Sequence, residues 1–286
     1  MYISIANAIY SSTLQGSGGG GVDNRFIITV KTDNAGTSNN EQFTIPTSTT
    51  GITQAFLYDI ETSDGQTITG NTGDTTITFP SAGTYDIYIS GSFPYIRFSN
   101  GGDKLKLLDI KNFGIYALGS TIQSNAFFGC SNLVISATDI GYFGDVTDFV
   151  YTWTLCSSLT SFPLIDTSSA TSFSLAWQNC SSLTSFPLID TSSATSFSNA
   201  WINCSSLTSF PQIDTSSGLL FNQTWYGCSS LTSFPQLDTS SGTNFSGTWR
   251  NCTGLTSFPL IDTSSVTSFF NTWQSCISLT SFPQLD

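Results

Sequence analysis

Residues 177–200 read W-Q-N-C-S-S-L-T-S-F-P-L-I-D-T-S-S-A-T-S-F-S-N-A, and closely similar 24-residue units precede and follow them without a gap. Self-similarity at a fixed period of this size indicates a repeat architecture whose units stack on one another. We therefore predict a solenoid of 24-residue turns over residues 101–286. Three residue types return once per turn, namely Trp153, Trp177, Trp201, Trp225, Trp249 and Trp273, then Cys156, Cys180, Cys204, Cys228, Cys252 and Cys276, and finally Asp166, Asp190, Asp214, Asp238, Asp262 and Asp286.

The apolar positions of the unit predict its inward face. Cys156, Leu159, Phe162, Ile165 and Phe173 keep one register through the following units, where Leu sometimes replaces Ile. Apolar residues that recur at one place in each repeat line the shared core of a solenoid. We expect these side chains and their equivalents to point inward in a single right-handed solenoid.

Each unit also contains signals for short strands and tight corners. Leu159–Phe162 and Thr171–Phe173 predict two short strands, and Pro163 ends the first because proline has no amide hydrogen for a ladder. Asp166–Ser169 is typical of a turn, since Asp and Ser side chains form hydrogen bonds with nearby amides. We expect a short helical or 3₁₀ corner over Ser174–Cys180.

The beginning of the repeat region is less regular. Phe127 and Cys130 occupy the tryptophan and cysteine places of an earlier turn, 26 residues before Trp153. Upstream of that turn, Leu105–Gly114 lies in a lysine-containing stretch. The open end of a solenoid needs a polar terminal turn, and we predict that this stretch supplies it.

The residues before the repeats predict a β-sandwich. Segments with alternating apolar residues are separated by clusters of Gly, Asn, Asp and Ser, a pattern typical of immunoglobulin-like sandwiches. We assign residues 22–100 to this sandwich. The expected strands are Phe26–Asp33, Gln42–Pro46, Ala55–Thr62, Thr75–Pro80 and Gly83–Gly91.

Residues 1–21 form a separate N-terminal anchor segment and Gly-rich linker. Gln15–Gly21 reads Q-G-S-G-G-G-G, the composition of a flexible tether. Tyr2–Tyr10 alternates like a strand. Two alternatives follow for it: addition to the sheet edge of another virion or surface protein, or an N-terminal strand of its own sandwich.

The unit A-W-x-x-C-S-S-L-T-S-F-P resembles the repeats of the BspA-like leucine-rich-repeat surface proteins, which typically show C-x-S-L-T-S. This resemblance covers roughly residues 101–286, with Trp where Phe is usual. G-T-Y-D-I-Y-I-S-G at Gly83–Gly91 resembles the closing strand of a PKD-type sandwich, which accompanies such repeats in the family. The usual W-G-D-G turn appears only as Thr62–Gly65. The resemblance implies a mainly β fold, a sandwich followed by a leucine-rich-repeat-type solenoid.

Charge and composition exclude several partners. The formal net charge is −12, and Arg250 is the single basic residue after Lys111. Nucleic acids and anionic membranes both need a basic footprint, so we expect no nucleic-acid partner. The sequence has no run of 18 apolar residues, which predicts no membrane insertion. The N-terminus, beginning at Met1, lacks the cationic and long apolar regions of a secretory signal.

The three recurring residue types leave alternatives open. We expect Cys156 to Cys276 to be reduced and buried as small apolar side chains, with disulfides between neighbouring turns as the alternative. The tryptophans form either core or an exposed platform for sugars, although a row of exposed indoles would be a large apolar patch. The aspartates either cap turns or bind calcium, and one carboxylate per turn favours the cap.

No catalytic site emerges from the sequence. Histidine is absent, no C-x-x-C pair exists, and glutamate occurs only at Glu41 and Glu61. Zinc therefore has no obvious ligands, and no nucleophile has a base beside it. We predict no enzymatic activity, no metal and no cofactor.

These observations predict a non-enzymatic structural and adhesion protein on a virion surface. The expected type is a phage appendage, such as a tail or head fibre, a receptor-binding protein or a decoration protein, that recognises host-surface glycan or protein. We expect ligand contact over a repeated Ser/Thr/Asn face. The alternative is a bacterial cell-surface adhesin, which requires an export signal. Because the sequence stops at Asp286 inside a unit, we expect either association, as in a homo-oligomer, or a longer natural chain.

Overall fold

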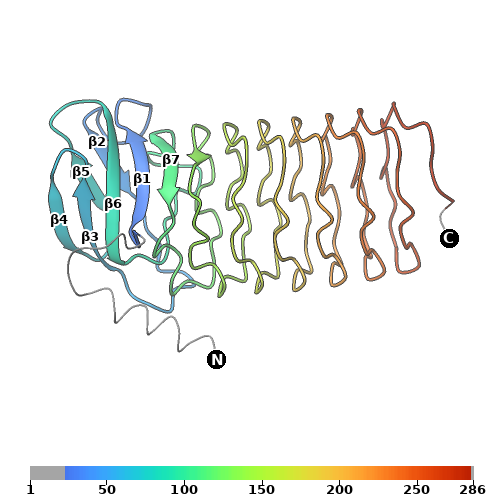
Figure 1. Cartoon of the computed structure of the whole chain (residues 1–286), viewed down its shortest axis with the longest axis horizontal. Coiled ribbons are helices and arrows are strands. Elements are labelled where there is room, and N and C mark those ends of the chain that lie inside the picture. Colours follow the sequence, from blue (N-terminus) through green and yellow to red (C-terminus); the bar gives the residue numbers. More distant parts are fainter. Residues whose placement is uncertain (1–22, 285–286) are drawn as a thin grey trace.

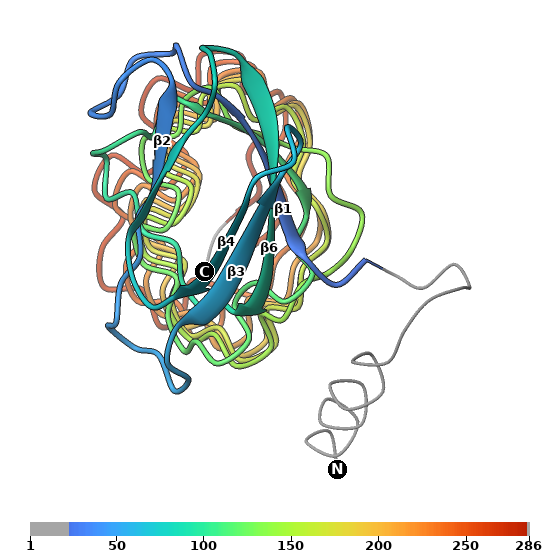
Figure 2. The same cartoon turned by 90° about the vertical axis from the view of Figure 1, so that its left-hand side faces the viewer.

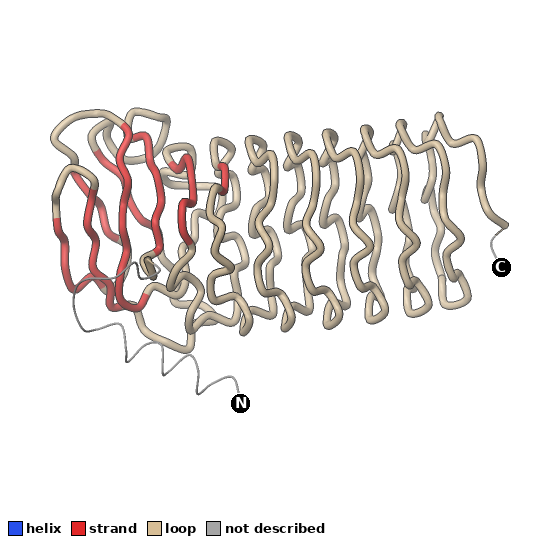
Figure 3. Tube along the Cα trace, in the orientation of Figure 1, coloured by secondary structure: helices blue, strands red, loops and turns tan. Residues whose placement is uncertain are grey.

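The protein is elongated, with β-sheets at one end and a long stack of chain turns at the other (Figure 1). The computed structural model describes residues 23–284. The anchor segment Tyr2–Tyr10 and Asp286 lie outside the described residues. The described chain is β-strand, turn and loop, with no helix (Figure 3). The fold is therefore mainly β, as the sequence predicts.

Within residues 23–284, eight strands form two sheets. The larger sheet has six strands in the order β4-β3-β6-β1-β7-β8, and the smaller pairs β2 with β5. All neighbouring strands are antiparallel except β7 and β8, which are parallel. The strands are β1 (Phe26–Lys31), β2 (Gln42–Ile45), β3 (Leu57–Thr62), β4 (Thr67–Asn71), β5 (Thr75–Thr78), β6 (Thr84–Ser92), β7 (Leu107–Asn112) and β8 (Val134–Ile135).

Alternating side chains explain the strands that the sequence predicts. In β3 the buried Tyr58, Ile60 and Thr62 alternate with exposed residues, which is the pattern of a strand with one face on a core. All five expected segments contain a strand, and β4 is an addition. β4 has one large apolar side chain, Ile68, and a glycine at Gly70, so its sequence gives little strand signal.

The expected polar cap over Leu105–Gly114 is wrong. This segment contains β7, which lies between β1 and β8 in the larger sheet. Leu107 and Ile110 are fully buried, and so is Lys106. The sheets themselves cover this end of the stack, so the end needs no polar turn.

The sheets and the stack share one continuous hydrophobic core, which extends from Phe26 to Ile261. β8 belongs to the first turn of the stack and extends the larger sheet beyond β7. Gln123, also fully buried, donates from Nε2 to the carbonyl of Pro94 (3.2 Å) and from its backbone N–H to the carbonyl of Asp148 in the next turn (2.8 Å). The larger sheet thus continues across the boundary expected at residue 100.

Each 24-residue unit forms one coil of the stack, and neighbouring coils are joined by backbone hydrogen bonds. Phe173 N–H donates to the Ser196 carbonyl (2.9 Å), and Trp177 N–H to the Ala200 carbonyl (2.9 Å). Seen from the sheet end, successive coils lie closely behind one another (Figure 2). The hand of the winding stays a prediction. One column of parallel bridges runs through Ile122, Asp148, Ser172, Ser196, Leu220, Asn244 and Ser268.

The coils contain less regular structure than the sequence predicts. The strand expected at Thr171–Phe173 is a single bridging residue, Ser172. The corner over Ser174–Cys180 consists of turns rather than a helix. Leu175 and Asn179 both have a φ of 60°, a left-handed conformation that interrupts a right-handed helix after each turn.

Candidate binding surface

The tryptophans form a buried column along the stack. The side chains of Trp153, Trp177, Trp201, Trp225 and Trp249 are at most 1% exposed, and Trp273 is partly buried. Successive indole rings are stacked with centroids 5.2–5.8 Å apart and planes within 3–9° of parallel. Phe127 extends the column, 6.4 Å from Trp153. Because the rings face the interior, they offer no platform to a sugar.

A second column of aromatic rings packs against the tryptophan column. Phe162 and its equivalents lie edge-to-face against the indole of their own coil, with centroids 4.7–4.8 Å apart and planes at 72–82°. Such contacts stabilise aromatic pairs beyond the area they bury. The six indole Nε1 atoms are buried without a hydrogen-bond acceptor among the described residues. These rings therefore act as apolar packing.

The cysteines form a buried column of thiols. All seven lie in the described part of the chain and are free. The Cys180 thiol donates a hydrogen bond from Sγ to the Trp153 carbonyl (3.2 Å), and the Cys204 thiol donates one to the Trp177 carbonyl (3.2 Å). Burial raises the pKa of these thiols well above the usual value. Neutral, enclosed thiols make poor nucleophiles and poor metal ligands.

The aspartates cap a turn on the outside of each coil. Asp166 Oδ1 accepts hydrogen bonds from the backbone N–H (3.1 Å) and Oγ (2.7 Å) of Ser168. Asp190, Asp214, Asp238 and Asp262 repeat this arrangement, with distances of 2.9–3.0 Å and 2.6–2.7 Å. The hydrogen bonds from Ser216 and Ser264 hold the pKa values of Asp214 and Asp262 below the ordinary range.

The turn caps do not assemble into a metal site. Within residues 23–284, no group of three or more His, Cys, Asp or Glu side chains could hold a metal ion. Each coil contributes one carboxylate to the column, whereas calcium takes six to eight oxygen ligands. The hydrogen bonds of the turn all end on Oδ1, so the serine leaves the other carboxylate oxygen, Oδ2, without a donor from the turn. These oxygens face the surface as acceptors.

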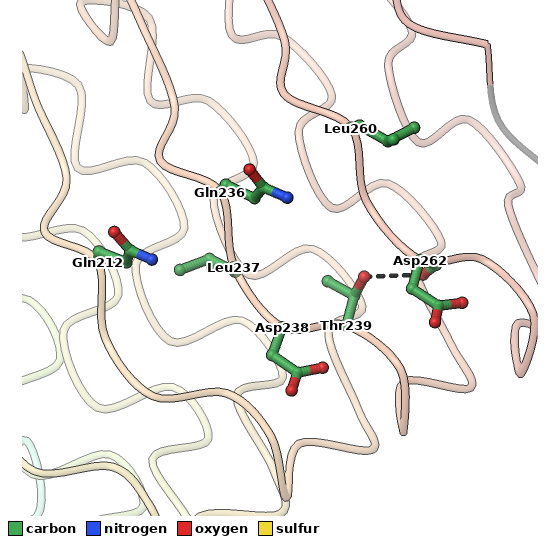
Figure 4. A pocket seen from close by; sticks show the side chains of 7 residues that line it. All are labelled: Gln212, Gln236, Leu237, Asp238, Thr239, Leu260 and Asp262. Carbon is green, nitrogen blue, oxygen red and sulfur yellow. Dashed lines mark hydrogen bonds between the residues drawn. The ribbon is translucent and has the colours of Figure 1, made fainter.

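A groove of about 370 Å³ crosses three coils beside the aspartate column (Figure 4). The side chains of Gln212 and Gln236 each extend from their own coil toward the next one. The buried Thr239 donates from Oγ1 to the Asp262 carbonyl (2.7 Å) and ties two of the coils together. This Gln–Asp groove is lined by Gln212, Gln236, Leu237, Asp238, Thr239, Leu260 and Asp262.

Two of the three coils of the groove carry glutamine at the place after the proline, the third carries Leu260, and the coil after it has Gln284. The residue after the proline is exposed in each coil, with Leu164 at 56% and Leu188 at 62%. At this place Gln212 and Gln236 replace leucine, and their amide groups make no hydrogen bond to the residues that the structure describes. Neither residue is among those predicted from the sequence, although the exchange between Leu and Gln inside an otherwise constant unit is visible there.

The surface carries no further sign of identity. No helix in the described part of the chain is long and apolar enough to cross a membrane. A search of protein-family models, of curated proteins and of solved structures finds no match to this chain.

Proposed function

We propose that the chain is a non-enzymatic structural and adhesion protein, in which a leucine-rich-repeat-type solenoid is capped by a PKD-type, immunoglobulin-like sandwich. One observation carries the proposal: each interior coil turns its Trp, Phe and Cys side chains inward and leaves its Asp and Ser side chains exposed or partly exposed. A long surface on which the same polar groups recur suits binding, because each coil adds a contact of the same kind.

We place this protein on a phage virion, as a tail or head fibre or another receptor-binding or decoration protein that recognises host-surface glycan or protein. The resemblance to BspA-like repeats favours the alternative of a bacterial cell-surface adhesin. Immunogold electron microscopy with antibodies against residues 23–284 tests the location. Gold on purified virions supports the first location, and gold on uninfected cells supports the second.

Deletion of whole coils tests the adhesive function. Removing residues 153–200 deletes two units and leaves the Gln–Asp groove untouched. The remaining coils are expected to close up, because each coil presents nearly the same side chains to its neighbours. Adhesion of beads coated with the shortened protein to host cells should then decrease partially and not be lost. If beads coated with the full-length protein adhered no better than uncoated beads, the adhesive function itself would be contradicted.

A further inference from the structure

We propose that the Gln–Asp groove binds an uncharged, extended polysaccharide that runs along the stack with one sugar unit per coil. This inference rests on the adhesive function proposed above and names its ligand class. It combines the free hydrogen-bonding groups of the groove, their spacing and their charge.

The groove offers the hydrogen bonds that sugar hydroxyls need. The amides of Gln212 and Gln236 each present two N–H donors and one carbonyl acceptor, none of them bonded to another residue between 23 and 284. Asp238 and Asp262 hold a serine through Oδ1, which leaves Oδ2 as an acceptor. A hydroxyl can donate to a carboxylate and accept from an amide at once. The coil with Gln236 and Asp238 therefore provides a donor and an acceptor to one sugar, and so does the preceding coil with Gln212 and Asp214. The third coil has Leu260 at the glutamine place and provides the Asp262 carboxylate.

The spacing of these groups matches a chain of sugars. Neighbouring coils are joined by backbone hydrogen bonds as strands are, which sets a rise of about 4.8 Å per coil. This rise is close to the length of one pyranose unit in an extended polysaccharide, so one sugar would lie against each coil. The half-exposed Leu260 adds an apolar surface for the C–H faces of the rings, beside the buried Leu237.

The charge of the groove selects among polysaccharides. Asp238 and Asp262 line it, Asp214 precedes them in the same column, and no Lys or Arg is among the lining residues. The whole chain has a formal net charge of −12. Carboxylates placed at this spacing repel an anionic polymer such as hyaluronan or a teichoic acid. The groove therefore favours uncharged glycans.

The coils themselves supply a matched pair of variants. Leucine already occupies the glutamine place at Leu164, Leu188 and Leu260, so Gln212→Leu with Gln236→Leu is compatible with the fold. This double variant removes the amide groups and leaves the aspartates. Leu188→Gln makes the reverse change in the coil next to Gln212 and lengthens the row of amides.

Isothermal titration calorimetry with linear hexasaccharides tests the proposal. The probes are uncharged hexamers of glucose, mannose, galactose and N-acetylglucosamine, with hyaluronan hexasaccharide as the anionic comparison. We expect the full chain to bind at least one uncharged hexamer and not hyaluronan. The double leucine variant should bind about tenfold more weakly, since two neutral hydrogen bonds are lost. Leu188→Gln should bind severalfold more tightly.

Two results would overturn the assignment: no heat with any uncharged hexamer, or equal affinities for the full chain and the double leucine variant. Bead adhesion separates this failure from failure of the proposed function. If the double leucine variant adheres to host cells like the unaltered protein, the adhesive function stands and the groove is not its site. If the unaltered protein does not adhere, the function fails.

Discussion

Replacing Lys106 by methionine should destabilise the protein strongly, although the residue lies far from the repeated coils. The Lys106 ammonium is fully buried beside Asp103, with Nζ 3.9 Å from Asp103 Oδ1. It donates to the carbonyls of Ser38 (3.1 Å), Asn39 (2.8 Å) and Gln42 (2.9 Å), and to Ser38 Oγ (2.7 Å). Methionine fills a similar volume and supplies none of these bonds.

The magnitude follows from what remains after the change. Asp103 keeps its hydrogen bonds from Thr37 N (2.9 Å), Ser38 N (2.9 Å), Thr44 N (2.7 Å) and Ser38 Oγ (2.6 Å), but its buried carboxylate loses the opposite charge beside it. The Ser38 carbonyl loses its donor, while the carbonyls of Asn39 and Gln42 lose the ammonium and keep bonds from Gln42 N–H (3.0 Å) and Ser38 Oγ (2.9 Å). Breaking a buried ion pair in this way costs roughly 3–5 kcal/mol. For a chain of this length, that loss lowers the melting temperature by roughly 6–20 °C.

Urea unfolding followed by tryptophan fluorescence measures the effect. All six tryptophans lie in the stack, so a shifted transition would also show that the sheets and the stack unfold together. Lys104→Met is the control, because Lys104 is partly exposed and bonds only Asn100; it should change the free energy of unfolding by less than about 0.5 kcal/mol. Equal effects of the two substitutions would refute the account of the buried ammonium.

Four further outcomes are expected. Leu155→Asn should raise the free energy of unfolding by about 1 kcal/mol in urea titrations, because Leu155 has a φ of 63° and asparagine tolerates this conformation; Leu164→Asn, outside that conformation, should bring no gain. Trp201→Ala should cost roughly 3–5 kcal/mol by the same titration, and a loss below about 1 kcal/mol would contradict the packing role of the column. Iodoacetamide at pH 8 should label only the partly buried Cys276 in the folded protein, as read by mass spectrometry, since burial keeps the other thiols neutral; rapid labelling of all seven would contradict it. Burial opposes ionisation of Asp103, but hydrogen bonds from Ser38 and Thr44 outweigh it and hold its pKa below the ordinary range. The carboxylate thus stabilises the fold at neutral pH and loses this contribution as the pH falls through the lowered pKa. The urea concentration at the unfolding midpoint should therefore decrease when the pH is lowered below about 4, and it should decrease less in Asp103→Asn.

The repeat made part of this fold predictable from sequence. A single period places Leu159, Phe162 and Ile165 in one register, and the structure buries all three. The alternation in β3 and β6 is equally direct, because one face of each strand packs on the core. Such patterns report which side chains leave water, and this is the largest favourable contribution to folding.

The remaining features depend on contacts that no local pattern contains. β7 reads as a lysine-rich turn, yet the chain beside it, including Asp103 and the loop at Ser38, supplies partners that allow Lys106 to be buried. The corner at Leu175 reads as helical, but hydrogen bonds to the next coil hold it in a left-handed conformation. The groove exists only when coils stack, so Gln212 and Gln236 come together only in the folded protein.

The hydrogen bonds between coils have a mechanical consequence. Each joins a residue to a partner about one unit away in sequence, so the bonds lie along the length of the stack. A lengthwise pull loads the boundary of the outermost coil first, and the bonds of that boundary open one after another. Every coil that detaches frees 24 residues, about 80 Å of extended chain. Under tension the stack would therefore lengthen coil by coil and absorb work at each step, while the coils nearer the sheets stayed folded.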